Sequence, residues 1–494
     1  MPANSGLQKR DRHTTVGRVL GPLVFAVMLG ADPFQDVMPT MAWRTAAVGL
    51  WMAIWWATEA VPVAVTAFLP LIVFEPLGVA SFREAAAPFA DPIVYLFLGG
   101  FLLALAVERW NLHRRVALAI LERIGTDGRR LIGGFMLACA LLSMWMTNTS
   151  TTMMLLPIVL SVIAVVRDGA SGVGEEDREN FAVAMLLGIA YAASIGGLAT
   201  LIGTPPNAFL VGYLADTYGY EISFARWMMI GIPVSALMLP FAWWLLTSIL
   251  FPVRIGENRA IEAHLHALRD EMGAVTTQEK RVGLVFLSVI ACWILRRPLS
   301  SGLGWMGLSD AGIAMTGAVA LFLLPSGDRA QPQLLVWKDA ARLPWGVLIL
   351  FGGGLSLAKT VSKTGLALWL GESLSPLGAW GPLVLVIAAV TLMVFLTELT
   401  SNLATAATLL PVLGAIAVQS SVSPILLAVP VTIAASCAFM LPVATPPNAI
   451  VFSTGNVRIP QMVRAGFWLN LIGIAIVTAI CHIIAPALLG GDVG

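Results

Sequence analysis

Residues Ser143 to Pro157 read SMWMTNTSTTMMLLP, and the rest of the chain is organised around this stretch. Five of its six central residues carry hydroxyl groups and the sixth, Asn148, carries an amide, although the flanking sequence is strongly apolar. An unsatisfied polar group in hydrocarbon costs several kcal/mol. Such a cluster therefore predicts a binding site and not an ordinary membrane-spanning segment.

The same arrangement recurs in the second half of the chain, at residues Thr397 to Pro411, TELTSNLATAATLLP. Residues separated by 254 positions match in several places. The matching pairs are Asn148/Asn402, Thr151/Thr405, Pro157/Pro411, Phe97/Phe351, Gly99/Gly353 and Gly100/Gly354. Several matches in one register indicate an internal repeat.

The composition is typical of a polytopic membrane protein. Of 494 residues, 58% are hydrophobic and 12% charged, and the mean hydropathy is +0.85. At roughly 20 residues per crossing, about ten to twelve spans fit this length. The net charge of +1 argues against a nucleic-acid partner. We interpret the four cysteines as small core residues, since they lie in apolar segments without paired spacing: Cys139, Cys292, Cys437 and Cys481.

The N-terminus is basic, and a long apolar segment follows it without a convincing cleavage site. This pattern predicts a cytoplasmic flank and not a removed signal peptide. The first apolar segments run at about 19–35, 41–58 and 61–78, and the TEAVP sequence at 58–62 predicts a helix break between the last two. We interpret Glu59 in this break as a helix-end carboxylate at the membrane interface.

The distribution of basic residues between the repeats predicts their topology. Residues 109–130 contain six arginines, whereas the equivalent residues 363–384 contain only Lys363. By the positive-inside rule, the two stretches lie on opposite faces of the membrane. An inverted-topology repeat of this kind is the architecture of many secondary transporters.

A second motif is repeated downstream of each polar cluster. The first half contains GTPPN at 203–207, and the second half contains ATPPN at 444–448. Tandem prolines remove two backbone donors from a helix. Two such motifs in matching apolar settings predict helices broken at membrane depth, which is tolerated where the backbone lines a cavity.

The four motifs together have the chemistry of an ion-coupled anion site. Broken helices present N–H groups to an anion and carbonyl groups to a cation, while hydroxyls and amides serve both. No Arg or Lys lies in the four motifs, so bound cations would supply the countercharge. Glu398 is the sole acid beside a cluster; it either tunes the second site or bonds nearby backbone, and we favour the backbone bond.

Three hydrophilic stretches separate the apolar parts. Residues 167–180 predict a solvated loop, 254–281 a surface helix with a linker, and 326–342 a shorter polar link. His264 and His266 form an isolated HxH sequence in the second stretch, which we interpret as solvated and not as a metal site.

The chain resembles the divalent anion–sodium symporter family, whose members carry dicarboxylates, citrate or sulfate. The resemblance rests on the paired TNT and SNL motifs, each followed by Thr-Pro-Pro-Asn, on TEAVPVAVTAFLP at 58–70 and on residues 91–121. It implies an all-α membrane protein of about 11 transmembrane helices with two re-entrant helical hairpins. It also implies a homodimer, each protomer having a scaffold domain and a transport domain that moves as an elevator.

The organisation expected from the repeat and the resemblance is as follows. A cytoplasmic segment (1–18) is followed by N-terminal scaffold helices (19–90) and by a first repeat (91–251), which contains a hairpin around 129–166 and a broken helix around 181–213. A cytoplasmic linker (252–281) and the scaffold helices of the second half (282–342) come next. The second repeat (343–490) contains a hairpin around 381–418, a broken helix around 424–455 and a final helix at 466–489.

The resemblance also implies site residues. The first Na⁺ site would use Ser143, Thr147, Asn148 and backbone at Gly203, and the second would use Thr397, Asn402 and backbone around Thr400 and Ala444. The substrate carboxylates would meet Asn148, Thr149, Ser401, Asn402, Thr445 and Pro446. No catalytic residue and no cofactor is expected, apart from Na⁺ as the coupling ion.

Two residues depart from the family pattern. Thr147 replaces a serine and keeps the hydroxyl, whereas Leu403 replaces a threonine and removes a donor for one carboxylate. The Thr-Pro-Pro-Asn sequence in both halves resembles the dicarboxylate branch, so the expected substrates are C4 dicarboxylates such as succinate, malate or fumarate. The expected location is the cytoplasmic membrane, in contact with lipid and with the N-terminus in the cytoplasm.

Other functions remain open on the sequence. Within the family, the alternatives are a sodium-independent dicarboxylate exchanger and a citrate or sulfate carrier; proton coupling is disfavoured because few titratable groups lie near the clusters. A membrane-embedded enzyme is disfavoured because no HExxH motif and no plausible Ser/His pair lies in an apolar segment. An anion channel is disfavoured because two broken-helix repeats predict a closed central site.

Overall fold

The computed structural model describes residues 4–31, 38–169, 174–303, 307–329, 331–374, 381–420 and 422–489. The predicted segments 1–18, 19–35 and 167–180 each lie partly outside these residues. Within them the protein is all-helical, with one isolated antiparallel bridge between Pro325 and Gln333. Eight helices are long and apolar enough to cross a membrane, and five further apolar helices are shorter. The expected all-α membrane fold is confirmed.

The helices of the first half, in chain order, are α1 (Asn4–Gly30), α2 (Thr40–Thr58), α3 (Val63–Thr66), α4 (Leu69–Val73), α5 (Phe82–Ala86), η1 (Ala87–Ala90), α6 (Pro92–Arg109), α7 (Leu112–Ile124), α8 (Gly128–Ser143), α9 (Asn148–Gly169), α10 (Glu175–Gly197), α11 (Pro205–Tyr218), α12 (Phe224–Trp244) and η2 (Leu245–Leu250).

The helices of the second half are α13 (Arg259–Met272), α14 (Thr277–Leu303), α15 (Asp310–Leu323), η3 (Trp337–Arg342), α16 (Trp345–Lys363), α17 (Leu366–Leu374), α18 (Pro382–Thr397), α19 (Asn402–Gln419), α20 (Pro424–Ala435), α21 (Pro446–Ser453) and α22 (Ile459–Leu489).

Short polar side chains begin several of these helices. Asp91, Asp127, Ser223, Asn258 and Ser309 each accept a hydrogen bond of 2.8–3.3 Å from a backbone N–H in the first turn of α6, α8, α12, α13 and α15. Those N–H groups have no partner within the helix, so a side-chain acceptor at the N-cap satisfies them. The residue at which each of these five helices begins is therefore determined by the local sequence.

The stretch after α2 is more broken than a single apolar segment at 61–78 suggests. α2 ends at Thr58, Glu59 takes a left-handed conformation (φ 46°) at its C-terminus, and only the short α3 and α4 follow. Pro62 precedes α3 and Pro70 lies in the first turn of α4, where a missing N–H is tolerated. The prolines thus explain why this apolar segment is not one continuous helix.

The two halves of the chain contact each other reciprocally. α10 contacts α21 while α11 contacts α20, and α9 contacts α21 while α19 contacts α11. Phe97 on α6 and Phe351 on α16, which match at the 254-residue offset, pack edge to face with ring centroids 4.9 Å apart. Contacts between equivalent residues and reciprocal pairs of elements are typical of an approximate two-fold axis.

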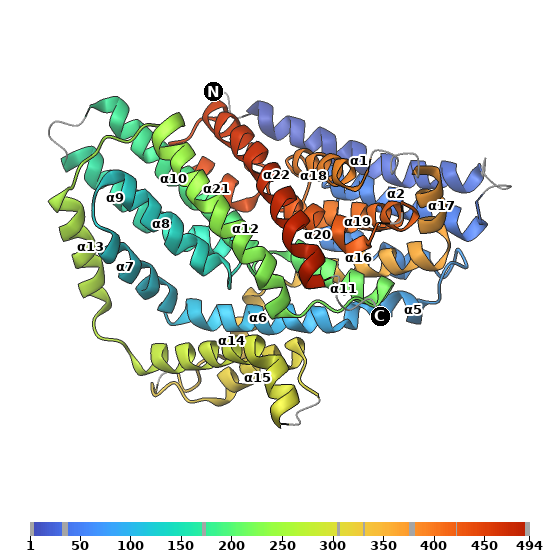
Figure 1. Ribbon diagram of the computed structural model, residues 1–494, viewed down its shortest axis with the longest axis horizontal. Coiled ribbons are helices and arrows are strands. Elements are labelled where there is room, and N and C mark those ends of the chain that lie inside the picture. Colours follow the sequence, from blue (N-terminus) through green and yellow to red (C-terminus); the bar gives the residue numbers. More distant parts are fainter. Residues whose placement is uncertain are drawn as a thin grey trace.

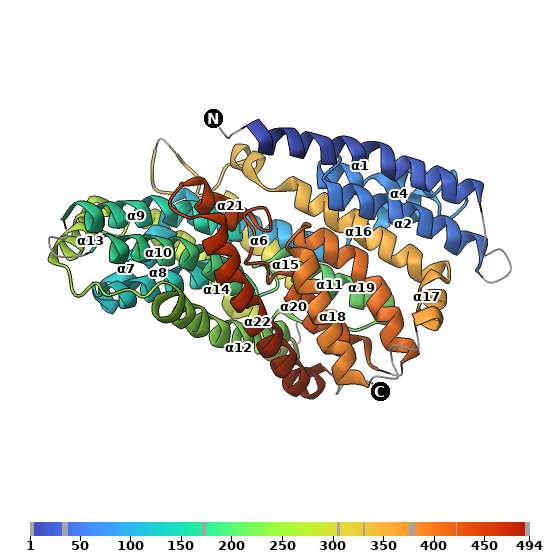
Figure 2. The ribbon, with the colours of Figure 1, turned by 90° about the horizontal axis from the view of Figure 1, so that it is seen from above.

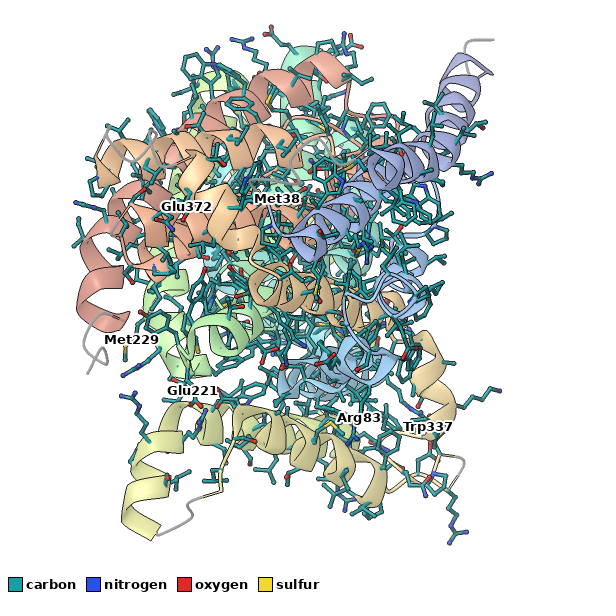
Figure 3. The ribbon with its side chains drawn as sticks, turned by 90° about the vertical axis from the view of Figure 1, so that its right-hand side faces the viewer. Met38, Arg83, Glu221, Met229, Trp337 and Glu372 are labelled. Atoms are coloured by element: carbon teal, nitrogen blue, oxygen red, sulfur yellow. The ribbon has the colours of Figure 1, made fainter. Side chains whose placement is uncertain are left out.

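The helices form two groups at opposite ends of the molecule, with α12 and α22 between them (Figure 1). Figure 1 shows α7, α8, α9 and α13 at one end and α1, α2 and α17 at the other, with α12 and α22 crossing the middle. Seen from above, α22 passes between the two ends (Figure 2). In the view of Figure 3, α14 and α15 form a layer along the lower side, with Trp337 at the edge.

Candidate functional site: two hairpin tips against two unwound segments

The first polar cluster lies in the break between α8 and α9. Ser143 ends α8 and Asn148 begins α9, and the Ser143 hydroxyl lies 2.7 Å from the Asn148 amide. The amide faces α10 and the segment beyond it, with the carbonyl oxygen of Ala193 at 3.0 Å and that of Gly203 at 3.3 Å. Asn148 therefore joins the tip of this helical hairpin to the first broken helix.

The Asn148 amide has two orientations with different consequences. With Nδ2 toward α10, it donates to the Ala193 and Gly203 carbonyls and to the Ser143 hydroxyl. With Oδ1 in that place, three oxygens of Asn148, Ala193 and Gly203 converge, and only the Ser143 hydroxyl donates to them. The choice between amide orientations is set by the surrounding hydrogen bonds. The second orientation is therefore favourable when a cation lies between these oxygens.

The first unwound segment, residues 198–204, separates α10 from α11. The Thr200 hydroxyl donates to the Met144 carbonyl in the hairpin tip and accepts from the Gly203 N–H at 3.1 Å. The buried Asn207 side chain donates to the Thr200 carbonyl at 2.8 Å and also lies within 3.4 Å of the Gly197 and Leu198 carbonyls. These bonds replace the helical bonds lost at the break, as burial requires.

Two glycines allow the end of α10 and the unwound segment to approach each other closely at this break. A Cβ atom on Gly197 would lie 2.6 Å from the Asn148 Oδ1 position and 3.0 Å from the Gly203 carbonyl oxygen, and one on Gly203 would lie 2.5 Å from the Gly197 carbonyl oxygen. Real Cβ atoms essentially never make contacts shorter than 3.0 Å, and a contact at 3.0 Å to backbone is already unusually tight. Glycine is needed at both positions because of close approach and not because of an unusual φ.

The second cluster repeats this geometry in the break between α18 and α19. The buried Thr397 hydroxyl lies 2.8 Å from Asn402 Oδ1 and 2.8 Å from the Ala435 carbonyl oxygen. Thr397 and Asn402 correspond to Ser143 and Asn148, and Ala435 is the last residue of α20, the counterpart of α10. One hydroxyl proton here faces two acceptors, so this cluster also has an excess of oxygen lone pairs.

The second unwound segment, residues 436–445, is held differently from the first. The Asn448 side chain donates to the Ala438 and Leu441 carbonyls at 3.3 and 3.0 Å, as Asn207 does in the first half. The Glu398 carboxylate, which lies in the hairpin tip, accepts the backbone N–H groups of three consecutive residues, Phe439 to Leu441. Glu398 thus bonds nearby backbone, the role that the sequence favours for it.

The two unwound segments meet in the interior. The buried Thr204 and Ser436 hydroxyls lie 3.1 Å apart, and the Tyr191 hydroxyl donates to the Phe439 carbonyl at 2.8 Å. Both links join the first half of the chain to the second. The segments against which the two clusters lie are therefore in direct contact with each other.

The predicted site residues differ in their exposure. Ser143, Gly203, Thr397, Ala444 and Thr445 are buried. Pro446 is exposed, and the others are half-buried: Thr147, Asn148, Thr149, Thr400, Ser401 and Asn402. The half-buried side chains lie at both tips and are partly accessible to solvent, whereas the buried ones are enclosed by the surrounding helices.

Some of the predicted site residues form hydrogen bonds within their own hairpin and, within the described ranges, none with the broken helices. The Thr147 hydroxyl donates to Ser150 at 3.0 Å, within its own hairpin, and the Thr400 hydroxyl lies 2.5 Å from that of Thr405. Among the described residues, no hydrogen bond joins the side chains of one tip to those of the other. Leu403 is 4% exposed and packs in the apolar core, whereas its counterpart Thr149 is half-buried.

Several residues of the site were missed by sequence reasoning. Thr200 and Tyr191 give no signal in the sequence, because a threonine or tyrosine in an apolar segment is common. Asn207 and Asn448 lie in the repeated Thr-Pro-Pro-Asn motif, so their duplication was a signal that both have the same task. In each half, the asparagine side chain donates hydrogen bonds to backbone carbonyl groups that the break in the helix leaves without a helical partner.

The sequence matches the family model of the sodium:sulfate symporter transmembrane region over residues 13–489. The chain belongs to this family. This confirms the resemblance to divalent anion–sodium symporters and the prediction of a transport protein over a membrane-embedded enzyme.

Similar proteins of known name cover almost the whole chain. A sodium-dependent dicarboxylate transporter, SdcS, from Staphylococcus saprophyticus is 43% identical over 482 residues, which are 97% of this chain and 92% of the relative. The SdcS protein of Staphylococcus aureus strain USA300 is 41% identical over 484 residues, with the same coverage. Both relatives thus align through all four motifs of the site.

Two solved structures share the fold at much lower identity. Neisseria gonorrhoeae MtrF, described with a class of antimetabolite efflux pumps, has a TM-score of 0.56 and 12% identity over 90% of this chain and 95% of its own. The Alcanivorax borkumensis YdaH transporter has a TM-score of 0.56 and 16% identity over 92% of this chain and 100% of its own. These likenesses concern the fold alone.

Proposed function

We propose that the protein is a secondary active transporter that carries C4 dicarboxylates such as succinate, malate or fumarate together with Na⁺ across the cytoplasmic membrane. One observation carries this proposal: each hairpin tip places an asparagine and a hydroxyl against the carbonyl groups of a broken helix, once in each half of the chain. The similarity to sodium-dependent dicarboxylate transporters over 97% of the chain supports the choice of ion and substrate.

The oxygen-rich clusters are suited to a cation. In the first, Ser143, Thr147, Asn148 and the Gly203 carbonyl would hold one Na⁺. The second would use Thr397, Asn402 and backbone around Thr400 and Ala444. Hydroxyl, amide and carbonyl oxygens are hard neutral ligands, so an ion bound to them is released more readily than one bound to several carboxylates.

Helix N-termini provide the complementary surface for the anion. α9 and α19 begin at Asn148 and Asn402, whereas α21, directly after Thr445, begins with Pro446 and Pro447, which have no N–H, so that α21 contributes its helix dipole alone. The first N–H groups of a helix and its dipole favour a carboxylate at that end. Ser401, Thr149 and these residues would contact the two carboxylates without any arginine or lysine, which makes release possible.

The architecture that we propose has two re-entrant hairpins within an inverted repeat of about 11 transmembrane helices. α8 and α18 have 16 residues each. At 1.5 Å per residue they reach about 24 Å, less than the roughly 30 Å of a bilayer core, which supports hairpins that turn back inside the membrane. We further propose a homodimer in which each hairpin and broken helix moves as an elevator against a scaffold, with the N-terminus in the cytoplasm.

The experiment that tests this function measures uptake of labelled succinate into proteoliposomes. We expect uptake with an inward Na⁺ gradient, and at most background uptake when choline replaces sodium. Internal dicarboxylate is varied in parallel. Uptake that needs internal dicarboxylate but no sodium would identify an exchanger instead, and competition by citrate or sulfate but not by succinate would identify a carrier of those anions.

The inverted repeat predicts the sides on which two exposed positions lie. Asn111 precedes α7 near Arg114, and Ser362 precedes Lys363 at the end of α16; both are exposed. Asn111→Cys should react with an impermeant thiol reagent only from the cytoplasmic side, and Ser362→Cys only from outside. The unmodified protein provides the background of the four native cysteines. Labelling of both positions from one side would contradict the inverted topology.

The substitution Leu403→Thr tests how the far carboxylate is held. The new hydroxyl is expected to tighten the apparent affinity for succinate about ten- to hundredfold, because a hydrogen bond to a charged group contributes roughly 1.5–3 kcal/mol. Without substrate the hydroxyl would bond the carbonyl four residues earlier, as Thr405 does with Ser401 at 2.9 Å. Thr149→Leu is the matched control and should weaken binding.

Apparent affinities for succinate, citrate and sulfate are measured on both variants. A weaker affinity for the native substrate in Leu403→Thr would mean that leucine shapes a pocket for a larger anion. Unchanged values for all three anions would mean that position 403, which is 4% exposed, does not face the substrate.

A further inference from the structure

Glu398 is a buried carboxylate that interacts with an unusual number of donors. It lies directly after α18 and is 3% exposed. Its Oε1 accepts the N–H of Phe439 at 2.7 Å and the side-chain amide of Asn470 at 2.7 Å. Its Oε2 accepts the N–H of Leu441 at 3.1 Å, and the N–H of Met440 lies 2.9 and 3.1 Å from the two oxygens. Both oxygens therefore serve as acceptors, as in an ionised carboxylate.

No basic side chain balances this charge. In the described part of the chain, Glu398 forms no ion pair with lysine, arginine or histidine, whereas other buried acids there do, such as Glu279 with Arg115 and Asp310 with Arg296. Neutral N–H donors stabilise a carboxylate but do not neutralise it. A buried charge without a partner is costly, and more so at membrane depth. Protonation would remove the charge but is opposed by the N–H donors that face both oxygens, whereas a bound cation would compensate the charge and leave those hydrogen bonds in place.

Glu398 connects the hairpin tip that carries the second cluster to the second unwound segment. Its neighbour in the sequence, Thr397, is the hydroxyl that faces Asn402 and Ala435. Its hydrogen bonds fix Phe439 to Leu441, in the same unwound segment as Ala444. Glu398 thus holds the hairpin tip and the unwound segment in one arrangement, and it carries a carboxylate on the residue next to Thr397.

The first cluster has no such group. At the 254-residue offset, the counterpart of Glu398 is Met144. There the tip and the unwound segment are joined by the neutral bond from the Thr200 hydroxyl to the Met144 carbonyl. The two clusters therefore share their ligand geometry but differ by one full negative charge.

We propose that Glu398 is the fixed countercharge and a positioning residue of the second Na⁺ site, so that this site binds Na⁺ more tightly than the first and fills before it. The inference rests on the proposed sodium-coupled function and adds an order of binding to it. The cation neutralises the carboxylate and completes the second cluster, and substrate then binds to a tip that is already held in place.

The test measures Na⁺ binding apart from transport. The full-length protein in detergent is heated at increasing NaCl without substrate, with choline chloride keeping the ionic strength constant, and the NaCl midpoint of stabilisation is determined. Glu398→Gln keeps the size of the side chain but removes the charge, so we expect its midpoint to rise about tenfold or more. Glu398→Asp keeps the charge and should stay within about threefold of the unmodified protein.

Met144→Gln is the matched control at the first tip, and its NaCl midpoint should stay within about twofold. Uptake adds a second readout: Glu398→Gln should keep its apparent KM for succinate, measured at saturating sodium, while its apparent KM for Na⁺, measured with sodium varied, rises. A purely structural role would instead lower the stability in sodium-free buffer and leave the NaCl midpoint unchanged.

An unchanged NaCl midpoint in Glu398→Gln overturns the inference while leaving sodium coupling intact. A tenfold rise of the NaCl midpoint in Glu398→Asp, which retains the charge, also overturns the inference. If Glu398→Gln does not fold, the result for Glu398→Asp decides the test. A lack of any stabilisation of the unmodified protein by NaCl overturns the sodium-coupled function itself, and the inference with it.

Discussion

Asn148→Ala and Asn402→Ala are each expected to abolish uptake while the protein still folds and inserts. Each asparagine lies in a tip where its amide meets a hydroxyl from the preceding helix, at 2.7 Å from Ser143 and 2.8 Å from Thr397. In the proposed function it contacts both a cation and a carboxylate. The loss of two charge-assisted contacts at roughly 1.5–3 kcal/mol each reduces affinity about a hundredfold or more.

The measurement is initial uptake of labelled succinate, together with size-exclusion profiles and thermal unfolding of each variant. Asn180→Ala is the matched control, since this asparagine lies near the start of α10 and donates to the Pro252 carbonyl at 3.4 Å. It should transport like the unmodified protein. Near-normal uptake by either tip variant would show that the binding-site assignment is wrong.

Gly197→Ala is expected to have an effect of similar size from a single added methyl group. The new Cβ would lie 2.6 Å from the Asn148 amide and 3.0 Å from the Gly203 carbonyl, so the hairpin tip and the unwound segment must separate. Because α10 is buried along most of its length, the backbone has little room to move. We expect loss of sodium-stimulated uptake and of thermal stabilisation by NaCl.

Gly188→Ala tests whether this effect is local. Gly188 lies on the same helix, but its added Cβ would meet the flexible side chain of Met136 at 3.1 Å, and a side chain adjusts more easily than backbone. This variant should keep its sodium response. A Gly197→Ala protein that still binds and transports Na⁺ normally would mean that the first site does not depend on close contact between Asn148 and Gly203.

The main features of the fold were predictable from the sequence because they are properties of local composition and of repetition. The apolar segments and the repeated Thr-Pro-Pro-Asn motifs can each be recognised within one segment. The family and the all-helical fold followed from them. The equivalence of Asn148 and Asn402 was also visible at the 254-residue offset, and the structure places each at the start of the second helix of a hairpin.

The boundaries of short helices were not predictable in the same way. The segment at 61–78 has the length and composition of a membrane span, yet it forms two short helices. Gly353 of α16 packs against the Ala67 carbonyl oxygen in the turn between them, where an added Cβ would lie only 2.2 Å away. Hydropathy does not reveal such a contact, since it depends on a residue almost 300 positions later.

That two equivalent polar clusters exist follows from the amino-acid sequence, because repetition and hydropathy can be recognised along the chain. The contacts of each cluster depend on the folded arrangement of the helices. Glu398 reaches Phe439 to Leu441 and Asn470, while Met144 in the equivalent position offers only its carbonyl to Thr200. The physical reason is that a carboxylate's partners depend on which backbone N–H groups are left free by a break in another helix.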